Sequence, residues 1–244
     1  MVLQSLNKHI KMPKNYLVAG GSSGIGLDLV KRLAGEGHQV TVVSRTNETL
    51  AGMANVHHIT HDFSAEGAPA LDIAALDGLA YCPGTINLKP FRGLKEKDFL
   101  HDYRVNVLGA ISCIQAASGA LKKGANPSIV LFSTVAVGQG MKYHASIAAA
   151  KGAVEGLTRS LAAEFAPDMR VNCIAPSVVD TPLATRILSN EDRKEASAKR
   201  HPLGRVGNAE DIAAMAAFLL SDQSGWMTGQ ILGIDGGMSA LRML

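Results

Sequence analysis

The sequence has few cysteines, few aromatic residues and almost no excess of charge of either sign. Its 244 residues contain three Cys, and only 5% of them are aromatic. The cysteines, Cys82, Cys113 and Cys173, are odd in number, lack metal-ligand spacing and have apolar neighbours. This excludes a disulfide scaffold, and we expect three reduced core residues in a cytoplasmic protein. The formal net charge of +3 includes no basic tract, so we expect no nucleic-acid partner.

Long hydrophobic runs are also missing. The two longest uncharged runs, Val105–Leu121 and Gly124–Met141, contain Asn, Gln, Ser and Gly, which a membrane-spanning helix would largely avoid. We therefore expect no membrane partner. The first eleven residues hold no apolar stretch of the kind found in signal peptides, and a second Met follows at Met12. We interpret residues 1–12 as a frayed leader.

What the sequence does contain is typical of one large α/β domain. Hydrophobic residues make up 47% of the chain, which is long enough to bury a large core, and we place the domain at residues 13–244. Short β-rich runs alternate with longer helical stretches, which predicts βαβ units. The expected fold is a single doubly wound parallel sheet, Rossmann-like, of about seven strands with helices on both faces.

The expected elements follow from this alternation. The strands are predicted near Asn15–Ala19, Gln39–Ser44, Val56–Thr60, Gly78–Cys82, Ser128–Ser133, Met169–Ile174 and Gln230–Ile234. The helices are predicted near Gly24–Gly35, Glu96–Lys122, Ser146–Phe165 and Ala209–Ser221. The polar segment Thr181–Val206 lies between a strand end and a helix start, and we interpret it either as a mobile lid or as a solvated helix pair.

A glycine-rich turn follows the first expected strand. Gly20, Gly24 and Gly26 lie between this strand and an amphipathic helix. Glycine at these positions lets the backbone turn tightly, approach a pyrophosphate and pack the helix start against the strand. The anion would then lie at the helix N-terminus, where free N–H groups and the helix dipole favour negative charge. The turn therefore predicts a dinucleotide site.

The end of the second expected strand indicates which dinucleotide is bound. NAD sites usually carry Asp or Glu here for the ribose 2′-OH, whereas Arg suits a 2′-phosphate. The sequence has Arg45 after Ser44 and no acidic residue from Val40 to Asn47. We therefore predict NADP(H) rather than NAD(H); the alternative is an Arg45 that simply faces water.

Taken together, these segments resemble the short-chain dehydrogenase/reductase family from Asn15 to the C-terminus. The C-terminal half carries the most specific motifs: KGAVEGLTRSLAAE from Lys151, RVNCIAP from Arg170, DTPL from Asp180, PLGRVG from Pro202 and TGQILGIDGG from Thr228. The family's Asn-Asn-Ala-Gly turn after the fourth strand is here Tyr81-Cys82-Pro83-Gly84, which keeps only the last Gly.

The resemblance implies a set of NADP(H)-binding residues. The glycine-rich turn would hold the pyrophosphate, Ser44 and Arg45 the ribose phosphate, and Asp62 and Phe63 the adenine. Val179 and Thr181 would lie at the nicotinamide end. The full expected set is Gly20, Ser22, Ser23, Gly24, Ile25, Gly26, Ser44, Arg45, Asp62, Phe63, Pro83, Gly84, Lys151, Pro176, Val179 and Thr181.

The resemblance also implies a catalytic set of Asn, Ser, Tyr and Lys, of which only part is present. Asn106 and Lys151 match the family's Asn and Lys, and Thr134 stands where the Ser is expected. Thr134 keeps a hydroxyl that can donate to a substrate oxygen. The Tyr position, four residues before Lys151, is occupied by Ile147, which cannot transfer a proton.

Three interpretations of Ile147 stay open. In the first, another group supplies the proton: Tyr143, which would share a helical face with Lys151 if the helix extends that far, or His144, or a water held by Lys151 and Asn106. In the second, the substrate is already activated and needs only hydride. In the third, the protein binds NADP(H) without catalysis.

The histidines before Asp62 suggest a different class of chemistry, metal binding. His57, His58 and His61 precede Asp62 and could ligate a metal by their spacing, but loop histidines are more often solvated or hydrogen-bonded, so we expect no metal. The sequence has no Gly-x-Ser-x-Gly elbow, so Ser-hydrolase chemistry has no support.

The sequence thus predicts an NADP(H)-dependent oxidoreductase with an altered proton-donor site. It would transfer hydride between the nicotinamide and a small organic carbonyl, imine or conjugated substrate. The alternative is a catalytically impaired NADP(H)-binding sensor or structural protein. The resemblance also implies a homodimer or homotetramer, paired through the two long helices and the C-terminal strands. The small-residue faces of Val105–Leu121 and Ala148–Ala163 fit such close helix contacts.

Overall fold

The computed structural model describes residues 12–242, so the expected leader lies almost entirely outside the described residues. Within residues 12–242, seven parallel strands form one sheet in the order β3-β2-β1-β4-β5-β6-β9. This order confirms the predicted doubly wound α/β fold. The strands are β1 (Asn15–Ala19), β2 (Gln39–Ser44), β3 (Val56–Thr60), β4 (Gly78–Tyr81), β5 (Ser128–Phe132), β6 (Arg170–Pro176) and β9 (Ile231–Ile234).

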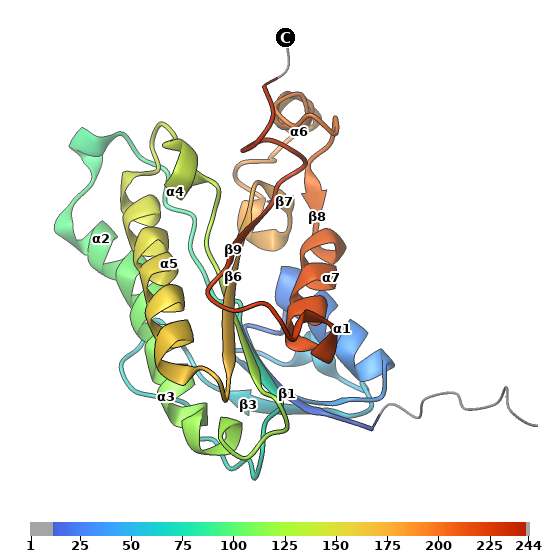
Figure 1. Ribbon diagram of the computed structural model, residues 1–244. Helices are drawn as coiled ribbons and strands as arrows, with labels where there is room; N and C mark the ends of the chain where they lie inside the picture. The colour runs from blue at the N-terminus through green and yellow to red at the C-terminus, as the bar shows by residue number, and fades with distance from the viewer. Residues whose placement is uncertain (1–11, 243–244) are drawn as a thin grey trace, which may run out of the picture.

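Helices cover both faces of the sheet (Figure 1). One face carries α2 (Glu96–Tyr103), α3 (Gly109–Leu121) and α5 (Ala145–Phe165), and the other carries α1 (Gly24–Gly35) and α7 (Ala209–Leu220). Successive strand residues alternate between two cores, so that Leu17 packs under the first helical layer and Val18 under the second. Burial on both faces explains why the strands read as continuous apolar runs.

The long helix expected over Glu96–Lys122 is interrupted. A π-helical turn, Arg104–Leu108, separates α2 from α3. The hydroxyl of Tyr81, at the end of β4, donates to the carbonyl of Val105 at 2.6 Å, and the Gly109 N–H bonds instead to the carbonyl of Arg104. A side chain from the sheet thus takes the acceptor that an α-helix would use, which widens the turn.

The segment Thr181–Val206 forms short elements beyond the carboxyl ends of the strands (Figure 1). It contains a 3₁₀ turn, Pro182–Ala184, and one α-helix, α6 (Glu191–Ala198). Its two ends are joined by a small parallel ladder in which β7 (Val179–Asp180) pairs with β8 (Gly207–Asn208). The segment therefore contains one α-helix and one tight turn, where one interpretation of the sequence predicts a pair of solvated helices.

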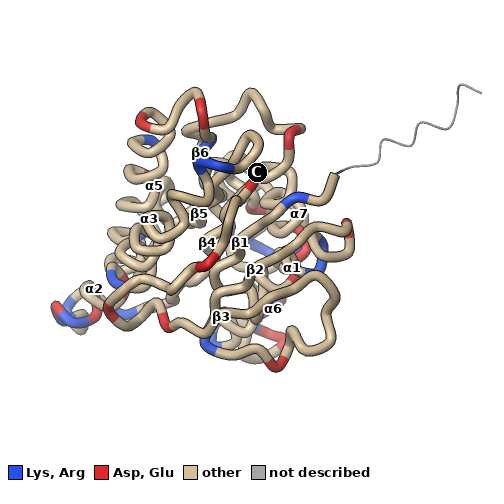
Figure 2. The backbone as a smooth tube through the Cα atoms, turned by 90° about the horizontal axis from the view of Figure 1, so that it is seen from below, with Lys and Arg blue, Asp and Glu red and all other residues tan. Residues whose placement is uncertain are grey.

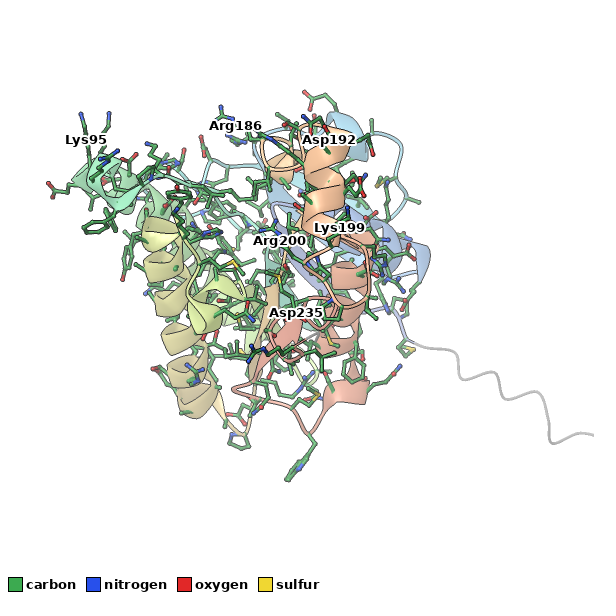
Figure 3. All side chains as sticks on the ribbon, turned by 90° about the horizontal axis from the view of Figure 1, so that it is seen from above. Lys95, Arg186, Asp192, Lys199, Arg200 and Asp235 are labelled. Atoms are coloured by element: carbon green, nitrogen blue, oxygen red, sulfur yellow. The ribbon has the colours of Figure 1, made fainter. Side chains whose placement is uncertain are left out.

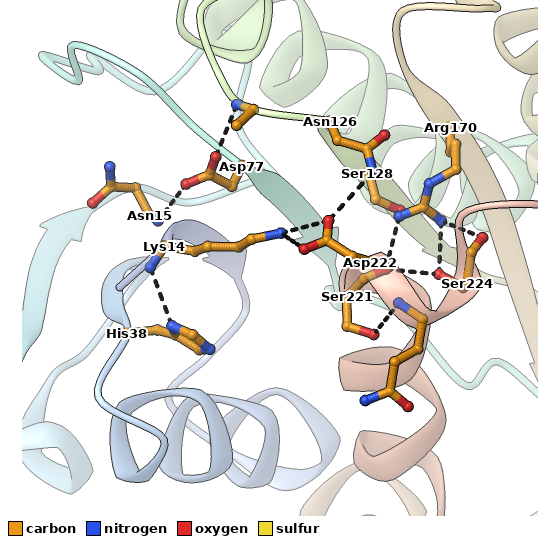
Figure 4. Close-up of polar contacts among 12 residues, drawn as sticks. Lys14, Asn15, His38, Asp77, Asn126, Ser128, Arg170, Ser221, Asp222 and Ser224 are labelled. Carbon is orange, nitrogen blue, oxygen red and sulfur yellow. Dashed lines mark hydrogen bonds and ion pairs between the residues drawn. The ribbon is translucent and has the colours of Figure 1, made fainter. Parts of the chain in front are cut away.

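A polar network lies at the amino ends of the strands, opposite the end at which Thr181–Val206 lies (Figure 4). The Lys14 ammonium group forms a 2.7 Å ion pair with Asp222, and the buried Arg170 guanidinium donates to the Leu219 carbonyl at the end of α7. These contacts join the start of the chain to the end of α7. Charged residues elsewhere lie mostly on outer helices and loops (Figure 2).

Candidate active site

A cavity of about 230 Å³ lies beyond the carboxyl ends of β4, β5 and β6, where doubly wound folds bind ligands. We call it the apolar cavity, because most of its wall is hydrocarbon. The apolar wall includes Ile86, Leu88, Met141, Ile147, Leu183 and Ile187. The polar lining residues include Thr85, Thr134, His144 and Lys151.

Lys151 and Asn106 meet beside Gly84. A Cβ atom on Gly84 would lie 3.3 Å from Asn106 Oδ1 and 3.6 Å from Lys151 Nζ, so a side chain at position 84 would crowd Asn106 Oδ1 and contact Lys151 Nζ. Lys151, on α5, donates to the Phe132 carbonyl at 2.8 Å. Asn106, in the π-helical turn, is buried, and its Oδ1 accepts no hydrogen bond from the described residues. The structure thus places an open acceptor close to an ammonium group.

Burial sets the acidity of Lys151. The side chain is 8% exposed, and this desolvation lowers its pKa to about 8, whereas the smaller effects of Cys173, Cys82 and Asp102 raise it. A Lys with this pKa is still mostly protonated at neutral pH but releases its proton much more readily than an exposed Lys. Cys82, which also lines the apolar cavity, has its pKa raised to about 12 by burial and is therefore not a nucleophile.

The hydroxyl at the end of β5 belongs to Thr134. Thr134 lines the apolar cavity and accepts from the Ala136 N–H at 3.3 Å, which leaves its own proton to donate. The neighbouring Ser133 is buried and donates to Glu155 Oε1 at 2.7 Å. Ile147 is 5% exposed, lines the cavity one helical turn before Lys151, and offers only hydrocarbon.

The helix does not reach Tyr143, so the condition under which Tyr143 would share a helical face with Lys151 is not met. α5 begins at Ala145, and Tyr143 lies in the preceding loop with φ of 72°, outside the lining of the apolar cavity. Its half-exposed ring lies under Lys142 Nζ, which is 5.0 Å from the ring centroid. His144 does line the cavity, and its Nδ1 bonds to the Lys142 carbonyl at 2.8 Å. A carbonyl only accepts, so Nδ1 carries the proton.

A buried carboxylate in the site was not predicted from the sequence. Asp102, with 0% exposure, accepts from Thr85 Oγ1 at 2.6 Å and from the hydroxyl of Ser146. Asn106 Nδ2 in turn donates to Thr85 Oγ1 at 2.9 Å and to the Asp102 carbonyl at 2.8 Å. These bonds fix the Asn106 amide so that Oδ1 faces Lys151. The only signal in the sequence is the four-residue spacing of Asp102 and Asn106, which places them on one helical face.

The glycine-rich turn fits a pyrophosphate. Gly20 has φ of 72° and approaches Pro83 so closely that a Cβ would lie 3.0 Å from its nitrogen, and a Cβ on Gly26 would lie 2.3 Å from the Gly20 carbonyl oxygen. Ser23 caps α1 without a side-chain hydrogen bond, so the N–H groups of the first turn, including those of Ile25 and Gly26, are not taken by that side chain. Close backbone packing and open donors are what an anion at a helix N-terminus requires.

Only part of the expected adenosine site points outward. Arg45 is exposed and makes no ion pair with the described residues. Asp62 accepts from the N–H and hydroxyl of Ser64, and these bonds lower its pKa, so the carboxylate is ionised. Ser44 is buried and donates to the Thr46 carbonyl at 2.8 Å, and the buried Phe63 ring packs edge-on against Tyr81. The side chains of Ser44 and Phe63 are therefore directed into the protein.

The expected nicotinamide end lies at the apolar cavity. Pro176, Val179 and Thr181 all line it, and Thr181 also packs against Gly24, whose Cβ would lie 3.3 Å from Thr181 Cβ. The glycine-rich turn and the cavity are thus contiguous. Thr181 contacts Gly24 and lines the same cavity as Lys151, so it connects the glycine-rich turn to the active-site lysine.

The histidines near β3 do not gather into a metal site. His58 Nε2 contacts the hydroxyl of Ser44 at 3.0 Å, and His61 packs edge-on against Phe63. No group of three His, Cys, Asp or Glu side chains able to hold a metal ion occurs among residues 12–242. Over the same residues, none of the helices combines the length and the apolar character needed to cross a membrane.

Comparisons with known proteins agree with this geometry. A family model described as enoyl-(acyl carrier protein) reductase matches residues 19–239. The chain is 32% identical over 236 residues to L-xylulose reductase from Bos taurus. The aligned region covers 93% of this chain and 97% of that protein.

Two solved structures are also similar. The aldohexose dehydrogenase of Thermoplasma acidophilum has a TM-score of 0.84 and 26% identity, with 95% of this chain and 96% of that chain covered. ElxO with NADP bound has a TM-score of 0.83 and 25% identity, with 94% of this chain and 100% of that chain covered.

Proposed function

Because the chain belongs to the short-chain dehydrogenase/reductase family, we propose that it is an NADP(H)-dependent oxidoreductase. Its substrate would be a small organic carbonyl, imine or conjugated compound. The observation that carries the proposal is that Lys151 and Thr134 line an apolar cavity contiguous with the glycine-rich turn, and that the open Asn106 Oδ1 lies behind Lys151, beside Gly84. We place this activity in one domain, residues 13–244, of a cytoplasmic protein whose three cysteines are free thiols.

The residues toward the cofactor support NADP(H) over NAD(H). The first turn of α1 would hold the pyrophosphate, with Gly24 against Thr181. The exposed Arg45 would bind the 2′-phosphate through charge-assisted hydrogen bonds, and the NADP in the ElxO structure is in keeping with this choice. When bound, NADP(H) supplies hydride chemistry at the nicotinamide end. Pro176, Val179 and Thr181 would set that end against the apolar cavity.

The proton would come from Lys151 rather than from a Tyr. Thr134 would donate to the substrate heteroatom and orient it. Lys151, with its pKa lowered to about 8, would hold the proton and pass it through a water seated on Asn106 Oδ1. Ile147 would exclude bulk water from the reacting atoms and pack against the apolar part of the substrate. Tyr143 is left out of this assignment because it does not line the cavity.

Consumption of NADPH tests the proposal. The wild type, Ile147→Tyr and Ile147→Phe are compared over one panel of ketones, iminium ions and quinones. Phe is the matched control, since it has the ring of Tyr without the hydroxyl. We expect the wild type to reduce at least one class, with iminium ions and quinones favoured over ketones, because these acceptors need no proton in the same step.

Each variant has a distinct expected effect. If only the acid is weakened in the wild type, Ile147→Tyr should speed ketone reduction by about 10²-fold or more, and Ile147→Phe should not. If both variants slow the reduction of every acceptor equally, Ile147 is needed as part of the apolar pocket that holds the substrate. Tight NADPH binding by a wild type that reduces nothing in the panel would contradict the proposal and favour an NADP(H)-binding sensor.

A further inference from the structure

A second cavity, of about 520 Å³, adjoins the apolar cavity and differs from it in charge. We call it the basic annex. Its charged lining residues are all cationic: Lys89, Arg186, Arg193 and Arg200. Arg186 and Arg200 lie along the side of α6 that faces α5 (Figure 3). The lining of the annex, as described within residues 12–242, includes no Asp or Glu.

The two cavities lie side by side and share part of their lining. Ile86, Leu88, Ile187 and Arg200 line both of them. Lys151, Thr134 and Ile147 line the apolar cavity alone. A molecule that reaches from one cavity into the other would therefore keep its reacting part beside Lys151 and place its far end among the arginines.

The arginines of the annex retain unused hydrogen-bond donors. Lys89 forms a 2.7 Å ion pair with Asp98, but Arg186, Arg193 and Arg200 form no ion pair with the residues that the structure describes. The Arg193 guanidinium donates once, to the Arg186 carbonyl at 3.3 Å, and the Arg200 guanidinium donates once, to Ser197 Oγ at 2.9 Å. A guanidinium has five donors and binds carboxylate or phosphate oxygens in pairs. Three such groups around one cavity without an acidic lining residue are complementary to an anion.

On the basis of the proposed function, we infer that the substrate carries an anionic group at the end remote from its reacting carbon, and that Arg186, Arg193 and Arg200 bind this group. The substrate is thus amphiphilic: an apolar chain or ring fills the apolar cavity, and a carboxylate or phosphate lies in the basic annex. Because the three arginines are exposed, this recognition is weakened by salt.

Calorimetric titration measures this selectivity without turnover. Octanoate, octyl phosphate and octanamide are titrated into the full protein, with and without saturating NADP⁺. The three probes have alkyl chains of nearly equal length and differ in their polar end. We expect each anion to bind roughly 10-fold more tightly than octanamide at low salt, and the difference to shrink at high salt. The anion that binds more tightly, carboxylate or phosphate, identifies the chemistry of the natural group.

Variants locate the anion. Arg200→Gln and Arg193→Gln should each weaken octanoate or octyl phosphate binding by roughly 5- to 10-fold and leave octanamide binding unchanged. Lys199→Gln is the matched control: Lys199 is also a cation near the end of α6, but it is 73% exposed, pairs with Glu195 and does not line the annex. It should change none of the three affinities.

Several results would overturn the inference. These are equal affinity for octanoate and octanamide, no detectable binding of either anion at millimolar concentration, or an equal loss in Lys199→Gln and Arg200→Gln. Failure of the proposed function would look different. In that case NADPH would not be oxidised by any acceptor, while the anion preference and its loss in Arg200→Gln could still be measured.

Discussion

Lys151 is the residue on which the proposed chemistry depends most. Its ammonium group is buried beside Gly84 and Asn106, donates to the Phe132 carbonyl and forms no ion pair with a carboxylate of residues 12–242. Desolvation therefore disfavours the charged form, and the pKa of Lys151 falls to about 8. The same burial that makes the group a usable acid also makes its charge costly to the fold.

Two pH dependences follow for Lys151. Reduction of ketones, which need a proton in the same step, should be fastest below about pH 7 and fall as pH rises through about 8, because Lys151 then loses its proton. Stability should change in the opposite direction. Between pH 8 and 10.5 the unfolded chain holds a proton that the folded chain has released, so the free energy of unfolding attributable to Lys151 rises with pH in this window.

Denaturant unfolding of the wild type and Lys151→Met at pH 7 and pH 10 separates this effect from other titrations. The wild type should gain on the order of 1 to 3 kcal/mol relative to Lys151→Met between the two pH values. A difference that stays constant with pH would show that the pKa of Lys151 is not lowered in the folded protein.

Arg45 decides cofactor choice in the proposal. It is exposed and makes no ion pair with the described residues, so its guanidinium is available for a phosphate. Arg45→Ala should weaken NADPH binding by roughly 10-fold or more and change NADH binding by much less, as measured by fluorescence titration. Arg159→Ala, on the exposed side of α5, should alter neither affinity. Equal weakening of both cofactors would remove the role proposed for Arg45.

At the scale of elements, the π-helical turn Arg104–Leu108 connects the sheet to the site. The Tyr81 hydroxyl holds the Val105 carbonyl, and the widened turn that results carries Asn106. The bonds among Asp102, Thr85 and Asn106 then orient the amide. A phenol at the end of β4 thus helps to set the direction of an active-site acceptor.

Removal of that phenol hydroxyl should affect both stability and activity. Tyr81→Phe leaves a buried carbonyl without its donor, so we expect the free energy of unfolding to fall by about 1 to 2 kcal/mol and the turnover rate to fall as Asn106 shifts. Tyr103→Phe is the control, because Tyr103 is 43% exposed and its hydroxyl makes no hydrogen bond with the described residues. Denaturant unfolding and NADPH consumption measure the two effects. Unchanged activity in a destabilised Tyr81→Phe would show that the turn does not position Asn106.

At the scale of the whole molecule, the faces of α3 and α5 are suited to contact with a second copy. A Cβ on Gly119 of α3 or on Gly156 of α5 would meet nothing within 4 Å, so both positions are open on the surface. Small residues let helix backbones approach closely, and homo-oligomers usually pair identical faces. These faces support the homodimer or homotetramer implied by the family.

Gly156→Arg should disrupt that assembly. The long charged side chain would stand on the contact face, so we expect a smaller molecular mass by size-exclusion chromatography with light scattering. Ala214→Arg, at an exposed position of α7 on the other side of the sheet, should leave the mass unchanged. If wild type and Gly156→Arg elute with the same mass, the faces of α3 and α5 are not the interface.

Features fixed by nearby residues could be predicted from the sequence. The sheet, its two helical layers and the glycine-rich turn depend on local hydrophobic period and on glycines that must meet backbone, as Gly20 and Gly26 do. The same holds for Ile147 at the wall of the cavity, since a helical turn fixes its place relative to Lys151.

Features that join distant residues were decided by the tertiary structure alone. No local pattern indicates that Tyr81 interrupts a helix, that Asp102 bonds to Ser146, or that Ser44 and Phe63 turn inward. The basic annex likewise joins a loop after β4 to α6, more than ninety residues apart. Such contacts depend on how completed elements pack, and packing is not encoded in the period or spacing of any one segment.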